Sequence, residues 1–207
     1  MRKRVVVTGI GGLCGLGNDV ASIWAAMRAS KSAIGPLQGS GLDDIKIRTA
    51  CQVTTFPIHN IDRRQTVSMD RFSLFAVIAA REAMAQSGLK ISEAASGRIG
   101  VTMGVGVFGA DTADVNYRKL LIEGKPRADI FAVPKIMPGA AAGQISMDLG
   151  LKGPTFGVTS ACSSSNHAFA TALDQLLLGR ADVMLAGGTE APLSWGVLKG
   201  WDALRIA

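Results

Sequence analysis

The chain has 207 residues, of which 48% are hydrophobic and 18% charged, so it is long and apolar enough for one sizeable domain with a buried core. Its formal net charge of +6 is spread along the chain, without a Lys/Arg run or interleaved aromatic residues, which argues against nucleic-acid binding. Its three cysteines are too scattered for a disulfide framework and form no Cys-x-x-Cys pair, so we expect no metal site and a reducing, cytoplasmic setting.

The amino-terminal segment MRKRVVVTGI has the basic-then-apolar order of a signal peptide, but Thr8 and the glycines after it cut the apolar run short. We predict instead a first strand at residues 5–7, followed by a glycine-rich turn. A helix over residues 20–29 comes next, with Asn18 or Asp19 as its cap. Strand, tight turn and helix form the first unit.

The middle of the chain contains the strongest helical pattern. Residues 30–66 mix glycine, proline and short β-prone pieces without a clear period, and we assign them to an excursion from the core. Residues 70–87, DRFSLFAVIAAREAMAQS, predict a helix that ends at Gly88. Because residues 72–80 are apolar on every side, this helix is expected to be buried between two layers. The apolar stretch is far shorter than the roughly 20 residues that cross a bilayer, so no membrane span is expected.

Strands and helices alternate in the remainder. We predict a strand at 98–104, helices at 111–123 and 139–149, a strand at 155–158, a helix from Cys162 to about Leu178, and a strand at 181–188. This order implies an α/β fold with a mainly parallel sheet and helices on both faces. The chain ends at Ala207 without a final covering element, so we expect one domain over residues 1–207 that stops before its last strand.

Cys162 stands between a predicted strand and the start of a helix, a position in which thiols become reactive. Free backbone N–H groups and the helix dipole favour the thiolate there. The neighbours Ser160, Ala161 and Ser163 are small and leave room for a bulky thioester, and the N–H of Cys162 could face a developing oxyanion. We therefore predict that Cys162 is a nucleophile; the alternative is a small buried hydrophobic residue.

The other cysteines and histidines receive no catalytic role. His167 lies five residues beyond Cys162, a rotation of about 140° around a helix, so we expect it to be structural. His59, Cys14 and Cys51 have no partner motif and no activating feature nearby.

The segment VTSACSSSNH, with GP shortly before it and DVMLAGGTE after it, resembles the active-site signature of the β-ketoacyl-acyl carrier protein synthases. The resemblance covers nearly the whole chain, through RVVVTGIGGLCGLGN, SMDRFSLFAVIAAREAM, RIGVTMGVGVFG and VPKIMPGAAAGQISMDLGLKGP to WDALRIA, and is strongest toward the nodulation protein E-like subgroup. It implies a thiolase-like fold of two similar halves, of which this chain is the amino-terminal half.

The reaction implied by the resemblance is a decarboxylative condensation without a cofactor. Cys162 accepts an acyl group from a carrier-protein thioester, and a carbanion from decarboxylated malonyl thioester attacks the acyl-enzyme to give a 3-oxoacyl chain and carbon dioxide. Covalent capture divides one hard step into two easier ones. The family also needs two histidines, a lysine and a phenylalanine-containing glycine turn from its second half, so we expect this chain alone to be inactive.

The resemblance also implies binding residues and partners. Positions that match the family's acyl pocket are Val107, Phe131 and Ala132, for which plain core packing is the alternative. Positions that match basic residues at the carrier-protein entrance, with a solvated charged face as the alternative, are Arg63, Arg64, Lys125, Arg127 and Arg205. Where relatives commonly have two basic residues before the Met-Asp pair, this chain has Val67 and Ser68, which a specialised carrier protein would explain. Family members are homodimers, so we expect the full-length protein to dimerise.

Two other classes compete with this interpretation. The hexapeptide GVGVFG at residues 104–109 fits the G-x-G-x-x-G pattern of a dinucleotide-binding dehydrogenase, but no strand with a terminal acidic residue follows at the expected distance. A non-catalytic scaffold would keep the fold and lose the nucleophile, and the presence of Cys162 argues against it. Taken alone, this chain is expected to expose a large apolar face on the helices predicted at residues 70–87 and 162–178.

Overall fold

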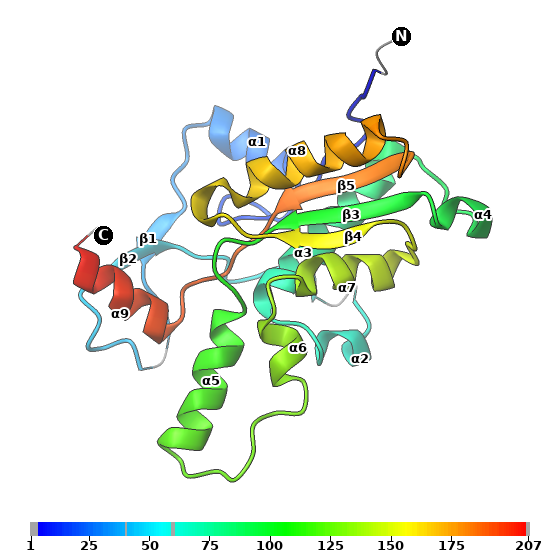
Figure 1. Ribbon diagram of the computed structural model, residues 1–207. Helices are drawn as coiled ribbons and strands as arrows, with labels where there is room; N and C mark the ends of the chain where they lie inside the picture. Colours follow the sequence, from blue (N-terminus) through cyan, green and yellow to red (C-terminus); the bar gives the residue numbers. More distant parts are fainter. Residues whose placement is uncertain (1–3, 40, 59–60, 206–207) are drawn as a thin grey trace.

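A three-stranded parallel sheet forms the centre of the computed structural model, which describes residues 4–39, 41–58 and 61–205. The strand order is β4-β3-β5, and β3 (Ile99–Gly104) pairs in parallel with both β4 (Thr155–Val158) and β5 (Val183–Gly188). Helix α8 lies on one face of the sheet, and α7 and α3 lie on the other (Figure 1). The predicted α/β architecture, a parallel sheet with helices on both faces, is confirmed.

The central strand β3 is buried along its whole length. Its sequence IGVTMG has no polar alternation, as expected for a strand that is covered on both faces. Val101 lies opposite Thr155 of β4 on one side and Leu185 of β5 on the other. The predicted strands at residues 98–104, 155–158 and 181–188 are therefore all present.

Helix α3 (Arg71–Ser87) is the buried helix that the apolar pattern predicted. The Asp70 side chain caps its first turn by accepting the N–H of Phe72, and Gly88 ends it in the left-handed conformation with φ 67°. Residues 72–78 are all buried, because the helix packs against α7 (Ala140–Leu149) and the sheet. The guanidinium of Arg81 joins α3 to α7 through two hydrogen bonds of 2.7 and 2.5 Å to the Asp148 carboxylate.

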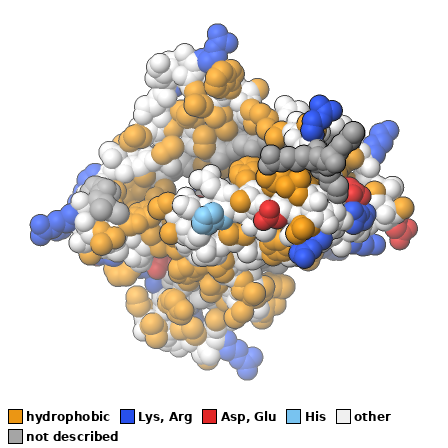
Figure 2. Space-filling view, turned by 45° about the horizontal axis from the view of Figure 1, so that its top comes forward, with side chains coloured by type: hydrophobic (Ala, Val, Ile, Leu, Met, Phe, Trp, Pro, Cys, Tyr) orange, Lys and Arg blue, Asp and Glu red, His pale blue; other side chains and the backbone are white. Residues whose placement is uncertain are grey.

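Helix α8 (Ser164–Leu177) is only half covered. Ala168 and Ala172 are buried on the side that faces the sheet. The other side exposes Phe169, Leu173 and Leu177, each by 38% or more. Hydrophobic side chains also cover much of the face that comes forward in Figure 2. The predicted exposed apolar face is thus present on α8, but the prediction was wrong for α3, because α7 and the sheet cover that helix.

The predicted first strand at residues 5–7 was wrong. Val5, Val6 and Val7 are exposed and belong to no strand. Residues 9–12, just after them, run along α3, where the N–H of Ile10 donates to the side-chain oxygen of Gln86 at 2.6 Å. A β-branched run indicates an extended backbone, but a strand also needs a neighbouring strand with which to pair. Helix α1 (Val20–Arg28) follows as predicted, with Asp19 as its cap.

The excursion at residues 30–66 contains an antiparallel pair, β1 (Ile34–Pro36) with β2 (Thr49–Cys51), and a short helix, α2 (Arg63–Thr66). Between the two strands, Ile45 and Ile47 form a second small core with Leu198 of α9 (Trp195–Leu204). His59 lies outside the described residues.

Three further helices complete the described chain: α4 (Glu93–Ser96), α5 (Ala110–Leu121) and α6 (Ala132–Ile136). Sequence patterns predicted α5 and α7 within two residues at each end, but not the short helices α2, α4 and α6, nor α9. Helices of four or five residues carry too little periodicity to stand out from loops. Across the ranges that the structure describes, no helix combines the length and hydropathy that a bilayer span requires.

Candidate active site

Cys162 lies in a single 3₁₀ turn, η2 (Ala161–Ser163), between β4 and α8. The prediction that it opens the long helix is corrected by two residues, since α8 starts at Ser164. Ala161 has φ 52°, a left-handed conformation that is unfavourable for a residue with a Cβ atom. The turn carries Cys162 to the surface, where its side chain is exposed. The alternative of a buried small hydrophobic residue is therefore wrong for this chain.

The side chain of Ser164 holds this strained turn. Its hydroxyl accepts the N–H of Ser160 at 2.9 Å and donates to the carbonyl of Ala161 at 2.6 Å, and Ser164 itself is 3% exposed. A residue with positive φ persists only where surrounding contacts fix it. The backbone of the two residues before Cys162 is thus fixed by a buried hydroxyl.

His167 contacts the turn through Ser160. Its Nδ1 atom lies 2.7 Å from the Ser160 hydroxyl oxygen, and which of the two donates depends on the imidazole tautomer. This contact supports the predicted structural role, because the ring atom is engaged with the residue that precedes the turn.

Two glycines at the strand ends let the turn sit directly on the sheet. A Cβ atom on Gly104, the last residue of β3, would overlap the backbone of Ser164 and Ser165. A Cβ atom on Gly188, the last residue of β5, would lie 2.5 Å from the Ser165 Cβ. The start of α8 therefore lies against the carboxyl ends of both strands, where ligands bind in open α/β sheets.

Glu190 is the site residue that sequence reasoning missed. Its Oε2 atom accepts the consecutive backbone N–H groups of Gly106 and Val107, both at 2.8 Å. Burial raises the pKa of the Glu190 carboxyl, although the two hydrogen bonds act in the opposite direction. The only signal in the sequence was its place directly after the apolar strand, in the segment AGGTE.

The same contact bears on the dinucleotide alternative. The N–H groups of a G-x-G-x-x-G turn bind a pyrophosphate in dehydrogenases. Here the Gly106 and Val107 N–H groups already bind the carboxylate of Glu190, and an anionic phosphate would meet that negative charge. The geometry disfavours nucleotide binding at this loop.

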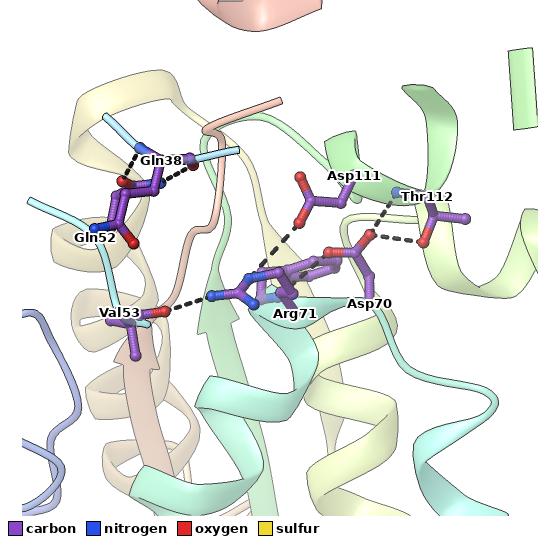
Figure 3. A network of polar contacts seen from close by, with 8 residues as sticks. Gln38, Gln52, Val53, Asp70, Arg71, Asp111 and Thr112 are labelled. Atoms are coloured by element: carbon purple, nitrogen blue, oxygen red, sulfur yellow. Dashed lines mark hydrogen bonds and ion pairs between the residues drawn. The ribbon is translucent and has the colours of Figure 1, made fainter. Parts of the chain in front are cut away.

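Two further carboxylates lie close together: Asp70 at the start of α3 and Asp111 at the start of α5 (Figure 3). The buried carboxylate of Asp70 accepts the N–H and the hydroxyl of Thr112 at 2.9 and 2.7 Å. Arg71 donates to the Val53 carbonyl at 2.6 Å and lies 3.7 Å from the carboxylate of Asp111. Burial, and next the charge of Asp70, raise the pKa of Asp111 to about 6, against the attraction of Arg71.

The three predicted acyl-pocket residues occupy different environments. Val107 is half-buried and follows Gly106, where a Cβ atom would lie 3.1 Å from the carbonyl oxygen of Ala161. Ala132 is buried at the start of α6, and Phe131 just before it is exposed. Helix α6 packs against α5 and α7. The structure thus places Gly106, the residue before Val107, next to the nucleophile turn, whereas Phe131 and Ala132 lie at the start of a separate helix.

The five predicted docking residues are all exposed and lie in three places: α2 (Arg63, Arg64), the segment between α5 and α6 (Lys125, Arg127), and the end of α9 (Arg205). Figure 1 shows α2 and α9 on opposite sides of the molecule, with the α5–α6 segment between them. Val67, two residues before Met69 and the Asp70 cap of α3, is also exposed.

Cys14 and Cys51 are free thiols, as expected. Among the residues that the structure describes, no group of three or more His, Cys, Asp and Glu side chains is arranged to hold a metal ion.

Comparison with known proteins agrees with this geometry. The family described as Beta-ketoacyl synthase, N-terminal domain matches residues 2–207. The chain is 57% identical over 206 residues to nodulation protein E of Rhizobium leguminosarum bv. trifolii, which covers 100% of this chain and 51% of that protein. It is 36% identical over 204 residues to 3-oxoacyl-[acyl-carrier-protein] synthase 2 of Staphylococcus aureus (strain COL), which covers 98% and 49%. The chain therefore spans about half the length of the curated relatives that it matches.

Solved structures show the same relationship. A β-ketoacyl synthase from Burkholderia phymatum STM815 superposes with a TM-score of 0.82 at 30% identity, over 98% of this chain and 50% of that one. The ishigamide ketosynthase/chain length factor superposes with a TM-score of 0.87 at 26% identity, over 99% and 51%. These neighbours confirm the predicted thiolase-like fold, in its amino-terminal half.

Proposed function

Because this chain belongs to the β-ketoacyl synthase family, we propose that it is the nucleophile-bearing half of a 3-oxoacyl-[acyl-carrier-protein] synthase, an acyltransferase of fatty acid or related lipid biosynthesis. In this proposal Cys162 takes the acyl group from a carrier-protein thioester. The rest of the catalytic groups belong to the part of the relatives that this chain does not span, so the chain alone is inactive.

One observation carries the proposal: Cys162 is exposed on a strained turn, and buried contacts with the start of α8 and the end of β3 fix the backbone of that turn. Ser164 fixes the two residues before Cys162, and Gly104 brings the turn onto the end of the central strand. A core cysteine does not need positive φ at its neighbour, whereas a nucleophile that must meet a bulky thioester does need a rigid, accessible position.

The chemistry follows from that position. The Cys162 thiolate attacks the thioester carbonyl, the carbon–sulfur bond to the carrier breaks, and the carrier thiol leaves with a proton. The acyl-enzyme is then attacked by the carbanion formed when a malonyl thioester loses carbon dioxide. The new carbon–carbon bond forms as the carbon–sulfur bond between the acyl group and Cys162 breaks, which leaves the 3-oxoacyl chain on the carrier that brought the malonyl group and returns the Cys162 thiolate.

The remaining assignments belong to the same proposal. Val107 lines the acyl pocket together with Phe131 and Ala132, and the five basic residues on α2, the α5–α6 segment and α9 dock the acidic carrier protein. The full-length protein works as a cytoplasmic homodimer. The name of the Staphylococcus aureus relative supports a carrier protein as the acyl donor.

The proposal is tested by intact mass spectrometry after incubation with an acyl carrier-protein thioester or with cerulenin, a cysteine-directed inhibitor of the family. The chain is compared with a form that continues to the full length of its relatives. We expect one acyl adduct on the longer form and none on Cys162→Ala. Cys51→Ala is the matched control, because Cys51 is also an exposed free thiol. An adduct that persists in Cys162→Ala, or none on the longer form, would reject the nucleophile and favour a non-catalytic scaffold.

A further inference from the structure

Glu190 ties the loop after β3 to the end of β5. A single oxygen, Oε2, accepts two consecutive N–H groups, from Gly106 and Val107, at 2.8 Å each. Hydrogen bonds to a carboxylate are shorter and about twice as strong as those between neutral groups. The loop backbone therefore has a defined position relative to β5.

The backbone beside Glu190 is itself anchored. The N–H of Thr189 donates to the Gly104 carbonyl at 3.0 Å, and its hydroxyl donates to the Phe72 carbonyl at 2.6 Å. These contacts connect Glu190 to the last residue of β3 and to the first turn of α3. The carboxylate thus projects from a rigid base and not from a free loop.

The loop that Glu190 holds lies against the nucleophile turn. A Cβ atom on Gly106 would lie 3.1 Å from the Ala161 carbonyl oxygen and 3.3 Å from Glu190 Oε2. Ala161 directly precedes Cys162, and Val107 directly follows Gly106. We call residues 106–107 the wall of the site; a shift of this wall would change its contact with the residue that directly precedes Cys162.

A charged carboxylate at position 190 lowers the stability of the fold, so stability does not explain why a glutamate lies there. Its Oε1 atom is buried and has no hydrogen-bond partner among the described residues: besides the Gly106 and Val107 N–H groups, the neighbouring Ala191 N–H approaches the carboxylate, but without the geometry of a hydrogen bond to Oε1. Asp70, at the start of α3, acts on Glu190 with a charge of the same sign. An unsatisfied buried oxygen next to a like charge costs stability, and such costs are retained where a site needs them.

We infer that Glu190 is a positioning residue for acyl-enzyme formation, which holds Gly106 and Val107 against the Cys162 turn so that a long acyl chain can enter beside the thiol. The inference rests on the proposed function of Cys162. Glu190 is not proposed to contact the substrate, because it acts through its hydrogen bonds to Gly106 and Val107.

The test uses the form extended to the full length of the relatives and two reagents that react with the same sulfur. Iodoacetamide is small and needs only an accessible thiol, whereas a long-chain acyl thioester also needs the wall beside it. Rates of modification at Cys162 are measured by mass spectrometry of the Cys162 peptide, which separates it from the exposed thiol of Cys51, for the unmodified sequence, Glu190→Ala, Glu190→Gln and Glu123→Ala. Glu123 is an exposed glutamate without a side-chain role in the described contacts, and serves as the control.

We expect Glu190→Ala to slow acylation at least about tenfold, as the loss of hydrogen bonds to a charged acceptor implies, while iodoacetamide alkylation stays within about twofold. Glu190→Gln should recover most of the rate, because its amide oxygen can accept the same N–H groups. Unchanged acylation in Glu190→Ala, or an equal loss with both reagents, would overturn the positioning role. Absence of acylation in the unmodified sequence would instead reject the proposed function, and the inference with it.

Discussion

The imidazole of His167 and the hydroxyl of Ser160 meet on one side of the nucleophile turn, with Nδ1 and Oγ 2.7 Å apart. Ser160 lies two residues before Cys162 and His167 lies five residues after it, so the contact bridges the nucleophile turn. It ties the first turns of α8 to the residue that precedes η2, which supports the expected structural role of the ring.

His167→Ala is expected to lower the melting temperature by a few degrees, because one exposed hydrogen bond contributes about 0.5 to 1.5 kcal/mol. Alkylation of Cys162 by iodoacetamide should change by less than about threefold, since the exposure of the thiol does not depend on the ring. Thermal unfolding and alkylation rates measure the two effects separately. A large loss of Cys162 reactivity in a folded His167→Ala protein would show that the histidine serves as a base.

Gly104→Ala is expected to destabilise the protein severely. The added methyl group would overlap the backbone of Ser164 and Ser165, and neither strand β3 nor helix α8 can move without breaking the layer contact. Overpacking of this kind costs about 1 to 3 kcal/mol or more. The free energy of unfolding from urea titration measures the effect.

Gly143→Ala is the matched control for that substitution. Gly143 lies inside α7 with no atom near the added methyl group, so alanine should stabilise the helix by about 0.4 to 1 kcal/mol. If Gly104→Ala and Gly143→Ala had the same effect, the close approach of β3 and α8 would be refuted.

Glu82→Ala is expected to release the loop before α1. The Glu82 carboxylate on α3 accepts the N–H of Gly12 at 2.9 Å and the N–H of Val20 at 2.8 Å. Each hydrogen bond to a charged group contributes about 1.5 to 3 kcal/mol, and less where water can replace it. Amide hydrogen exchange should accelerate at Gly12 and Val20, with Glu123→Ala as the control that leaves both unchanged. Unaltered exchange at both amides would contradict this role.

The raised pKa of Asp111, about 6, predicts a stability that falls as pH rises. The unfolded carboxyl ionises near 4 and the folded one only near 6, because burial and Asp70 disfavour the charge. The free energy of unfolding therefore falls as pH rises from about 4 to about 6, and this loss stays constant at higher pH. Asp111→Asn should melt higher than the unmodified sequence at neutral pH, and this advantage should shrink toward about pH 4.

Asp129→Asn should have the opposite effect to Asp111→Asn and lower the melting temperature at neutral pH. Lys119 lies 2.9 Å from the Asp129 carboxylate and lowers its pKa, so this group stabilises the fold above its unfolded pKa and loses that effect as pH falls. Melting curves of both variants at several pH values test the pair. If Asp111→Asn were less stable at neutral pH, attraction to Arg71 would outweigh burial.

The amino-acid sequence alone determined those elements whose start, end and buried face depend on residues within the segment. The apolar run with Asp70 before it and Gly88 after it determined α3, and the small residues between an apolar strand and a helix pointed to Cys162. In these cases the physical cause lies within the segment, in a cap, a left-handed glycine or an uninterrupted apolar face.

Tertiary structure decided the features that depend on a distant partner. Residues 5–7 have the composition of a strand, but none of the described strands pairs with them, so they form no strand and are exposed. Glu190 was indistinguishable from any residue after a strand until the fold brought Gly106 and Val107 within 2.8 Å of its carboxylate. Strand pairing and backbone-to-carboxylate hydrogen bonds join residues far apart in the chain, and only the packing of the layers brings those residues together.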